Sequence, residues 1–375
     1  MKAKIALIRG KFLNAYEMQI FEPLVKKYDI TAFGSLAPYH EKFAFPVIKL
    51  PSPMDLPNFP KKMPILNRIF TDVHYLYGLE EKLRGFDIVH SAETYFYYTK
   101  QALNAKKKGY VKKVIATVLE NIPFNNEGIW GRKELKRNAR ENLDHMIALT
   151  QRTKDTLILE GADEKKITVI SHGINTEIFY PGKNGVSNKK NLTIMFAGRL
   201  EKYKGVYEIL YAIKLLNLDK DLKDFNLKYT IVGDGSEKIN MLMLEKKLSI
   251  DRIITHKNLE YTQMPEEYRK ADIFLAPSKP TDTYQEQYCT ALLEAQASGL
   301  PIVTTFSGGI PENLGEAGLI IGPGDFYSLK ESIKEFILST QKRLFFSKKA
   351  RERALKIHDT KVIAKKLENL YQSLL

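Results

Sequence analysis

The sequence predicts two doubly wound α/β domains, each built around a parallel sheet. The chain of 375 residues exceeds the usual size of a single hydrophobic core. In both halves, short apolar or β-branched runs alternate with helical stretches, as expected for strands joined by crossover helices. A stretch rich in Gly, Asn and Ser, near residues 173–191, separates the halves and is predicted to be a linker.

The predicted strands can be given in chain order. Those of the first half are KIALI, ITAFG, DIVHS, KVIATVL, HMIALT and ITVIS, and those of the second are LTIMFAG, KYTIVG, ADIFLAP, LPIVTT and AGLIIG. The stretch from Pro46 to Pro64 interrupts the first half and is predicted to be a loop, either a lid over a substrate or an ordinary surface loop. These runs place the two domains at residues 1–177 and 178–357.

Residues 358–375 are predicted to form a final amphipathic helix that packs on another element. Its apolar residues recur close to helical spacing; they are Val362, Ile363, Leu367, Leu370 and Tyr371.

Composition is that of a globular protein, with 44% hydrophobic and 27% charged residues. No apolar run reaches the length of about 18 residues that a membrane-spanning helix needs. Arg9 and Lys11 interrupt the first apolar stretch too early for a signal peptide, so we expect a cytoplasmic protein. The single cysteine, Cys289, cannot form an intramolecular disulfide, and no His/Cys cluster has zinc-ligand spacing, so no metal is predicted.

The formal net charge of +14 predicts attraction to anions, which include nucleotide phosphates, acidic lipid head groups and nucleic acids. No helix-turn-helix, zinc-finger or RNA-recognition signature is present, so a nucleic-acid partner is not expected. The densest basic stretch, Lys100 to Lys113, is interpreted as a solvated helix end and loop. Its alternative role is peripheral contact with an anionic membrane at the inner face.

The first stretch with chemical content is LTIMFAGRLEKYKG, where an apolar strand ends at Gly198 and two cations follow. Ligands of doubly wound sheets bind beyond the carboxyl ends of the strands. Arg199 can therefore fork onto two phosphate oxygens there, and Lys204 can act as a point charge. The alternative interpretation is a basic surface turn.

The second stretch is APSKPTDTYQEQYCTALLEAQASGLPIVTTFSGGIPE, with a strand, a polar loop and a helix from about Cys289 to Ser298. The helix start, near Tyr288 to Ala291, offers free N–H groups to a diphosphate. Glu286 in the loop and Glu294 in the helix suit the hydroxyls of a sugar and a ribose. Structural alternatives are a helix-start acid for Glu286 and a lysine partner for Glu294.

The order FAGRLEKYKG, IVGDGSEK, ADIFLAPS, EQYCTALLEAQASGLPIV and SGGIPE resembles the retaining family 4 glycosyltransferases of the GT-B fold. The likeness is close over residues 191–325 and includes SHGINTEIFYP, from Ser171 to Pro181. It implies two Rossmann-like domains that face a cleft, with the final helix packed back on the N-terminal domain. It further implies that Arg199 and Lys204 hold the donor diphosphate, that Glu286 meets the donor sugar, and that Glu294 binds the ribose.

The resemblance also implies a wider donor site. A first-domain loop would close over the diphosphate, and loops of the second domain would frame the base and sugar; these residues are Gly10, Lys11, Asn14, Gly198, Gly233, Asp234, Gly235, Asn258, Leu259, Gln287, Tyr288, Cys289, Thr290 and Ala291. The chain departs from the family at Gln287 and Cys289, where relatives often have glycines.

Catalytic candidates in the first domain are Glu120 and His90. Glu120, with Asn121, follows a strand end where many relatives carry a histidine, and His90 lies with Glu93 at another strand end. A lone histidine is more often structural than catalytic. The aromatic group Tyr95 to Tyr98 is predicted to be core.

The function expected from the resemblance is transfer of a sugar from a nucleoside-diphosphate sugar to a glycan or lipid-linked acceptor hydroxyl, with retention of anomeric configuration. No cofactor is expected besides the nucleotide-sugar co-substrate. The alternatives are a nucleotide-sugar epimerase or a sugar phosphorylase of the same fold, and a non-catalytic nucleotide-sugar-binding protein.

Overall fold

The computed structural model describes residues 2–60, 62–182 and 190–375 and divides the chain into two units. Unit 1 runs as far as Gly173 and includes Thr360–Leu375, and unit 2 comprises Ile174–Asp359. The predicted domain boundaries lay at 177/178 and 357/358. Of the predicted linker, residues 183–189 lie outside the described part, and residues 174–182 belong to unit 2.

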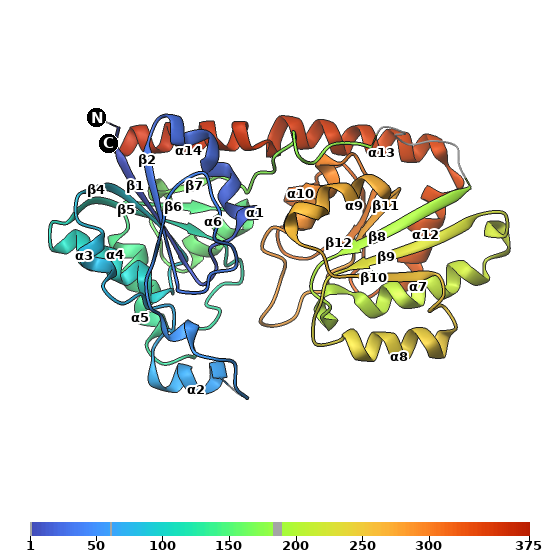
Figure 1. Ribbon diagram of the computed structural model, residues 1–375, viewed down its shortest axis with the longest axis horizontal. Coiled ribbons are helices and arrows are strands. Elements are labelled where there is room, and N and C mark those ends of the chain that lie inside the picture. The colour runs from blue at the N-terminus through green and yellow to red at the C-terminus, as the bar shows by residue number, and fades with distance from the viewer. Residues whose placement is uncertain (1, 61, 183–189) are drawn as a thin grey trace. The chain divides into compact units, whose positions relative to one another are not determined.

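Unit 1 contains a seven-stranded sheet in the order β3-β2-β1-β4-β5-β6-β7, and each neighbouring pair of strands is parallel. The strands are β1 Lys4–Gly10, β2 Asp29–Gly34, β3 Val47–Lys49, β4 Phe86–Ala92, β5 Val111–Val118, β6 His145–Ala148 and β7 Ile167–Val169. The helices are α1 Ala15–Met18, α2 Lys62–Ile69, α3 Leu79–Lys82, α4 Tyr97–Lys107, α5 Arg132–Asn142, α6 Gln151–Leu159 and α14 Thr360–Leu374, with the 3-10 helix η1 Gln19–Lys26 (Figure 1).

Alternate residues of β1 supply the two cores of unit 1, because successive side chains of a strand point to opposite faces of the sheet. Ala6 and Ile8 pack with Leu103 of α4 on one face. On the other, Ile5 and Leu7 belong to the cluster that contains Leu367 of α14. Both faces are covered by helices, and this explains why the strand sequences read as continuous apolar runs.

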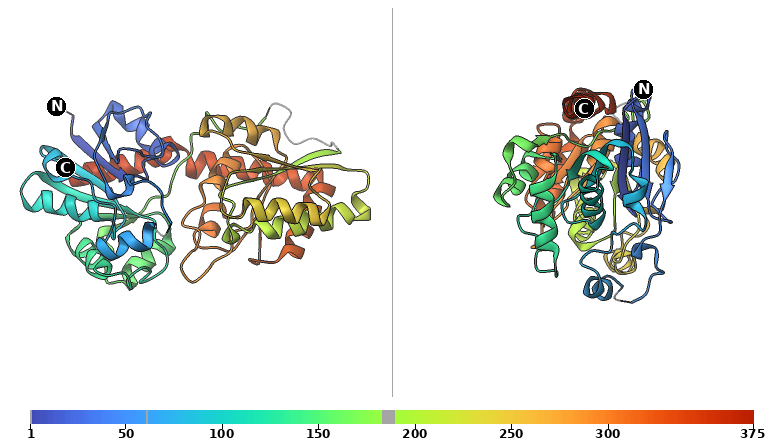
Figure 2. Two further views of the ribbon diagram at one scale, coloured as in Figure 1. Left: turned by 60° about the horizontal axis from the view of Figure 1, so that its bottom comes forward. Right: turned by 90° about the vertical axis from the view of Figure 1, so that its left-hand side faces the viewer.

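Unit 2 contains a six-stranded parallel sheet in the order β10-β9-β8-β11-β12-β13. The strands are β8 Asn191–Ala197, β9 Asn226–Val232, β10 Ile254–Lys257, β11 Ile273–Ala276, β12 Ile302–Thr305 and β13 Leu319–Ile321. The helices are α7 Val206–Leu218, α8 Lys238–Leu248, α9 Met264–Lys270, α10 Thr290–Ala297, α11 Ile310–Leu314, α12 Phe326–Leu338 and α13 Thr340–Arg353. Figure 2 shows the strands of this sheet between layers of helices.

Both sheets follow the same Rossmann-like order, so the predicted fold class is confirmed. Two short strands were not predicted: β3, which lies inside the Pro46–Pro64 stretch, and β10. Both are edge strands that contain exposed or half-exposed residues, and neither has the continuous apolar run on which the prediction depended. Among the helices of the described ranges, none is long and apolar enough to cross a membrane.

Candidate active site

The direction of strand order in unit 2 reverses between β8 and β11, and this is the point where doubly wound sheets bind their ligands. The loop after β8 carries both predicted cations, Arg199 and Lys204; Lys204 is the last residue of the 3-10 helix Lys202–Lys204. The loop after β11 carries Glu286 and leads into α10. The topology therefore brings the two motifs, separated by about eighty residues, to one edge of the sheet.

Lys204 and Glu286 form an ion pair across this edge. The side chain of Lys204 is 16% exposed and that of Glu286 only 5%. The Ser278 hydroxyl donates a second hydrogen bond to the carboxylate at 2.6 Å. The backbone of Glu286 is also fixed, because its N–H donates to Ser307 Oγ at 3.3 Å and its carbonyl accepts from Gly309 N at 2.7 Å. The carboxylate is thus held in one orientation before any ligand arrives.

The pair keeps both partners charged. Burial acts to raise the pKa of Glu286, but attraction to Lys204 and the hydrogen bonds from Lys204, Ser278 and Tyr284 outweigh it, so the pKa lies below its ordinary value. Burial acts to lower the pKa of Lys204, and Glu286 raises it well above the ordinary range. A ligand phosphate that approaches this edge meets an ammonium group that is charged at any physiological pH.

Two tyrosines support the cations. The rings of Tyr203 and Tyr284 lie 4.1 Å apart between centroids. The Arg199 guanidinium lies 5.5 Å from the Tyr203 ring centre, and Lys204 Nζ lies 5.4 Å from that of Tyr284. Cations near aromatic faces are stabilised by the ring quadrupole. Arg199 is itself exposed, so its guanidinium remains available to a ligand.

The glycines of these loops allow close backbone packing. A Cβ on Gly233 would lie 2.0 Å from the carbonyl oxygen of Gly198, and one on Gly235 would lie 2.4 Å from that of Leu200. On Gly205, whose φ is +73°, it would lie 2.0 Å from the carbonyl oxygen of Pro277. Gly198, Gly233 and Gly235 therefore allow the loops after β8 and β9 to pack closely against each other beside the candidate site. In the structure Gly233 and Gly235 face protein backbone, and Gly198 faces the ring of Phe196.

The start of α10 is held by a side chain from α11. The Asn313 amide donates to the carbonyl oxygens of Tyr288 and Cys289, the latter at 3.2 Å. Cys289 adopts the left-handed conformation with φ of +58°, a geometry that favours glycine and is strained for other residues. This turn presents the first N–H groups of the helix, which begin at Thr290 and Ala291, as an anion site.

Glu294 lies within α10 and is 6% exposed. Tyr268 donates a hydrogen bond to its Oε2 at 2.8 Å. Burial raises the pKa of Glu294 to about 7, although the hydrogen bonds from Tyr268 and Tyr261 act in the opposite direction. The lysine partner considered from the sequence is not its partner; two tyrosine hydroxyls are.

The remaining predicted residues of unit 2 lie on loops at the same edge. Asp234 accepts a hydrogen bond from Gly235 N at 2.9 Å and is exposed. Asn258 and Leu259 follow β10, the edge strand beside β9. Gln287 lies between Glu286 and the turn before α10 and is half-buried.

In unit 1, the residues predicted to follow the first strand have local structural partners. Gly10 has φ of +53°, and a Cβ there would lie 3.3 Å from the ring of Tyr98. Lys11 donates to the carbonyl oxygen of Ala37. Asn14 caps α1 by accepting from Glu17 N at 2.8 Å and is 1% exposed. A donor-binding role for Asn14 is not supported by this geometry, because its side chain is used in the cap.

His90 is fully buried in the core and both ring nitrogens are engaged. Nδ1 lies 2.7 Å from the Tyr371 hydroxyl of α14, and Nε2 lies 2.7 Å from Thr117 Oγ1. Burial, with a contribution from Arg9, lowers its pKa well below the ordinary value. As placed, His90 joins β4, β5 and α14 and has no free nitrogen for a substrate, so its proposed catalytic role is withdrawn.

Glu120 shapes the loop after β5. Its Oε1 accepts from the N–H groups of Asn121 and Ile122, each at 3.0 Å, and its Oε2 accepts from Asn125 at 2.8 Å. These bonds give the carboxylate a turn-stabilising role. Glu120 lies at the expected edge of the sheet, but its oxygens accept hydrogen bonds from the loop itself, which a local sequence pattern does not show.

Glu93 is a better candidate than Glu120 for a functional carboxyl group at this edge of the sheet. From the sequence it was named only as a neighbour of His90. It has φ of +59° and is 2% exposed. Its Oε1 accepts from Leu119 N at 2.9 Å and Glu120 N at 3.2 Å, whereas no described residue bonds its Oε2. Burial and the neighbouring Glu120 raise its pKa to about 8. A buried, strained carboxyl with an unsatisfied oxygen is typical of a functional position.

A second unpredicted group lies at the start of α4. Asp72 accepts from Tyr97 N at 2.8 Å, bonds His74 Nδ1 at 2.8 Å and accepts from Arg132 at 3.2 Å. Within the described chain, His74 Nε2 and Arg132 Nε have no hydrogen-bond partner. Asp72 and His74 share the loop between α2 and α3, whereas Arg132 begins α5 some sixty residues later, so no local sequence pattern could have assembled the group.

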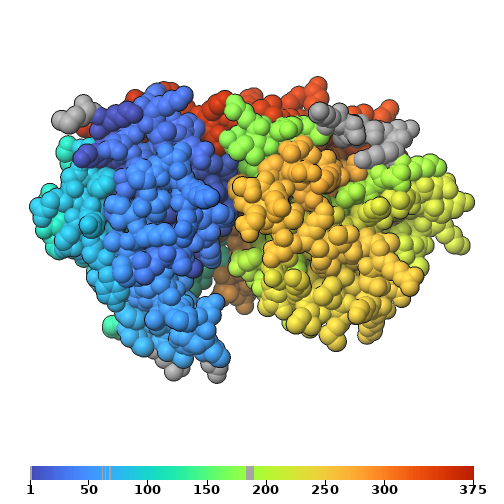
Figure 3. All heavy atoms as spheres, viewed as in Figure 1, coloured from blue at the N-terminus to red at the C-terminus, as the bar shows by residue number. Residues whose placement is uncertain are grey.

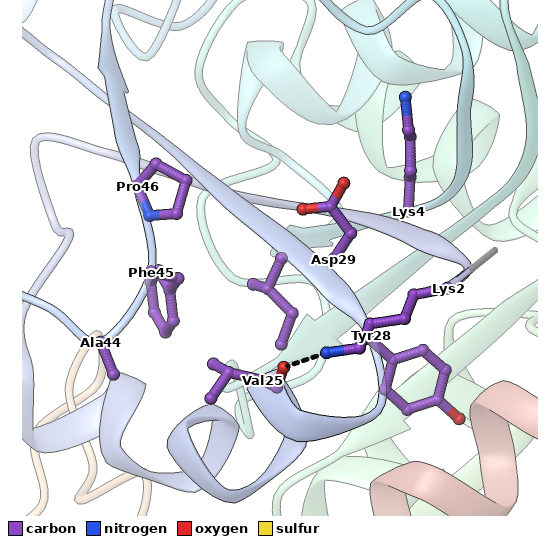
Figure 4. A pocket seen from close by; sticks show the side chains of 9 residues that line it. Lys2, Lys4, Val25, Tyr28, Asp29, Ala44, Phe45 and Pro46 are labelled. Atoms are coloured by element: carbon purple, nitrogen blue, oxygen red, sulfur yellow. Dashed lines mark hydrogen bonds between the residues drawn. The ribbon is translucent and has the colours of Figure 1, made fainter.

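A pocket of about 460 Å³ opens at the opposite edge of the unit 1 sheet (Figure 4). Lys2, Lys4, Tyr28 and Asp29 line it, at the amino ends of β1 and β2. Lys2 Nζ donates to the carbonyl oxygen of Val25 at 3.1 Å. Ligands of doubly wound sheets bind at the carboxyl edge, so this pocket is not the candidate site.

Fold and site together define a protein with two Rossmann-like units, of which the second carries two cations and a helix start at one edge of its sheet. Two family models match consecutive parts of the chain, Glycosyltransferase Family 4 over residues 30–178 and Glycosyl transferases group 1 over residues 179–353. The chain therefore belongs to the family 4 glycosyltransferases of the GT-B fold.

Curated relatives include the capsular polysaccharide biosynthesis glycosyltransferase CapM of Staphylococcus aureus, 28% identical over 61% of this chain and 62% of CapM. A D-inositol 3-phosphate glycosyltransferase of Corynebacterium jeikeium is 29% identical over 62% of this chain and 58% of its own length. The matches thus span less than two thirds of either relative. Among solved structures, Anabaena HepE in complex with UDP and glucose has a TM-score of 0.77 at 16% identity, covering 99% of this chain and all of HepE.

The close approach at Gly205 generates a stability prediction. Gly205→Ala is expected to lower the free energy of unfolding by more than about 2 kcal/mol, because it combines a positive φ with a clash against Pro277. The control is Gly324→Ala, also in unit 2, where φ is +82° but the nearest atom to a Cβ lies at 3.8 Å. Urea unfolding measures both, and equal losses would mean that the contact with Pro277 contributes nothing.

Glu93 generates a pH prediction. Because folding raises its pKa from 4.5 to about 8, the stability due to the neutral carboxyl is complete below about pH 4.5 and is lost as the pH rises to 8. The slope is at most about 1.4 kcal/mol per pH unit. Glu93→Gln should flatten the fall in hydrogen-exchange protection of β4 and β5 between pH 5 and 8. The exposed Glu81→Gln variant should follow the wild type; an unchanged slope in Glu93→Gln would contradict the assignment.

Proposed function

We propose that the chain is a glycosyltransferase that moves a sugar from a nucleoside-diphosphate sugar to an acceptor hydroxyl of a glycan or a lipid-linked sugar, with retention of anomeric configuration. Family membership supports the reaction class. The observation that carries the site assignment is the Lys204–Glu286 pair at the point where the strand order of unit 2 reverses. HepE, the structural neighbour solved with UDP and glucose, makes UDP-sugars the first donors to test.

In this proposal the donor diphosphate lies against the N-terminus of α10, where the free N–H groups of the helix favour an anion. Arg199 and Lys204 neutralise it. Cleavage of the bond between the anomeric carbon and the diphosphate oxygen places further negative charge on the leaving group. The two cations then stabilise the transition state more than the ground state, which is the condition for catalysis.

The carboxylates bind hydroxyls. Glu286, already oriented by Ser278, accepts hydrogen bonds from the donor sugar, and Glu294 accepts from the ribose diol. The acceptor oxygen forms the new bond to the anomeric carbon as the diphosphate leaves, and its proton passes to an oxygen of the leaving diphosphate. In unit 1 the residues proposed to meet the acceptor are Glu93, with its unsatisfied oxygen, and His74. No cofactor beyond the nucleotide sugar is proposed.

The acceptor could be presented at a membrane. Exposed apolar residues gather on and beside α2, in the segment at the lower end of unit 1 in Figure 3; they are Phe59, Met63, Ile65 and Ile69. Trp130, the only tryptophan, is 74% exposed. Exposed aromatic and apolar side chains suit a lipid interface, and the net charge of +14 would favour anionic lipid. Vesicle flotation tests this contact: we expect binding that increases with anionic lipid, and indifference to lipid charge would count against it.

The cations generate the functional prediction. Lys204→Ala should lower kcat by about 10²- to 10³-fold with the true donor and acceptor, as for the loss of one group that stabilises developing charge. Lys202→Ala, in the same short helix but with a side chain 74% exposed, is the matched control and should stay within about twofold. Full turnover by Lys204→Ala would refute the site assignment.

The rival functions are separated by a ligand screen followed by turnover. We expect thermal stabilisation by one series among uridine, guanosine, adenosine and thymidine diphosphates and their sugar conjugates, without added metal. Donor consumption only in the presence of acceptor identifies a transferase, and consumption without it indicates an epimerase. Dependence on inorganic phosphate indicates a phosphorylase, and binding without any turnover indicates a non-catalytic binder.

A further inference from the structure

The chain passes between the units twice, from Gly173 to Ile174 and back from Asp359 to Thr360. We call residues 174–176 and 358–359 the crossing segments. They are bonded to each other: Ile174 pairs with Asp359 in a parallel bridge, and Ile174 N donates to the carbonyl oxygen of His358 at 2.7 Å. Thr176 Oγ1 also donates to the Asp359 carboxylate. The two connections therefore behave as one paired structure.

His358 joins this paired structure to the candidate donor site. It is 1% exposed, and its Nε2 lies 3.0 Å from the carbonyl oxygen of Asn313. A carbonyl can only accept, so Nε2 carries the proton, and in the neutral ring Nδ1 accepts from the Tyr288 hydroxyl at 3.1 Å. Tyr288 belongs to the turn that leads into α10. One imidazole thus contacts both the turn and the residue that clamps it.

Asn313 makes this connection stiff. It is fully buried, and its amide nitrogen donates to the carbonyl oxygens of Tyr288 and Cys289. Its amide oxygen accepts from Gln296 of α10 at 2.9 Å. Its backbone carbonyl receives Arg353 at 2.7 Å in addition to His358. A displacement at the start of α10 must therefore be shared with Asn313 and His358.

The far end of α10 is tied to the crossing segments as well. Arg351 donates to the carbonyl oxygen of Ala297, the last residue of α10, at 2.6 Å. The same guanidinium donates to the carbonyl oxygens of Phe179 at 2.9 Å and Thr176 at 3.1 Å. The residues between Arg351 and the second crossing include the π-helical turn Ala354–His358, a rare geometry that is frequent at functional sites.

We propose that His358 is a positioning residue that couples nucleotide binding at the first turn of α10 to the crossing segments between the units. It rests on the proposed function, since it requires a diphosphate at α10. Binding fixes the Tyr288–Cys289 turn, and Asn313 and His358 pass that restraint to the bonded pair Ile174 and Asp359.

The test uses UDP as the probe and combines calorimetry with hydrogen exchange of the full chain. In the wild type, UDP should bind and slow exchange at the backbone N–H groups of residues 174–176 and 358–359 by about tenfold, a typical coupling magnitude. In His358→Gln, UDP should bind within about threefold of wild type, but the change in exchange at the crossing segments should disappear. The donor KM should change little and kcat should fall, because donor binding is kept while the restraint on the crossing segments is lost.

Matched variants and outcomes separate the possibilities. His145→Gln replaces a histidine of unit 1 that bonds Thr168 at 2.8 Å, and it should keep the UDP-dependent change. If His358→Gln does not fold, His358→Asn provides a shorter amide for the same comparison. Wild-type UDP binding without a change at the crossing segments overturns the coupling alone. A folded His358 variant that shows the same UDP-dependent change in exchange as the wild type also overturns the coupling. Failure of the wild type to bind UDP overturns both the coupling and the proposed UDP-sugar donor.

Discussion

The structure of the candidate donor site depends on the ion pair between Lys204 and Glu286. It spans the two loops at which the strand order of unit 2 reverses, so one contact fixes the cation, the carboxylate and the loops that carry them. A buried pair of this kind is costly to desolvate and is weak evidence for stability. The pair matters here because it orients the two side chains. Ser278, Ser307 and Gly309 bond to Glu286, and Lys204 stays charged. A phosphate that attracts Lys204 would free Glu286 for a sugar hydroxyl.

Unit 1 repeats the same topology with different chemistry at its edge. Its switch between β1 and β4 is followed by Gly10 on one side and Glu93 on the other. Here the carboxylate is buried without a cation on it, and its pKa is raised to about 8. The charged groups at the unit 2 edge suit the proposed donor diphosphate, and the carboxyl of Glu93 suits the proposed acceptor hydroxyl.

The fold could be predicted from the sequence, and the candidate donor residues could be proposed from it, because both leave local signatures. Buried parallel strands read as continuous apolar runs, and Arg199, Lys204, Glu286 and Glu294 occur within short ordered motifs. The edge strands β3 and β10 lack that signature. His90 was misjudged because its partners, Thr117 and Tyr371, are distant in sequence and use both of its nitrogens. Glu93 was undervalued because its burial and positive φ are properties of the folded chain.

We propose that Lys204, paired with Glu286, binds the donor diphosphate. A crystal structure of the chain with UDP would show whether it does. We expect the diphosphate to lie at the first turn of α10, within hydrogen-bonding distance of both Arg199 and Lys204, and Lys204 to have moved from Glu286 toward a phosphate oxygen. A diphosphate bound elsewhere, or bound beside an unchanged Lys204–Glu286 pair, would contradict it.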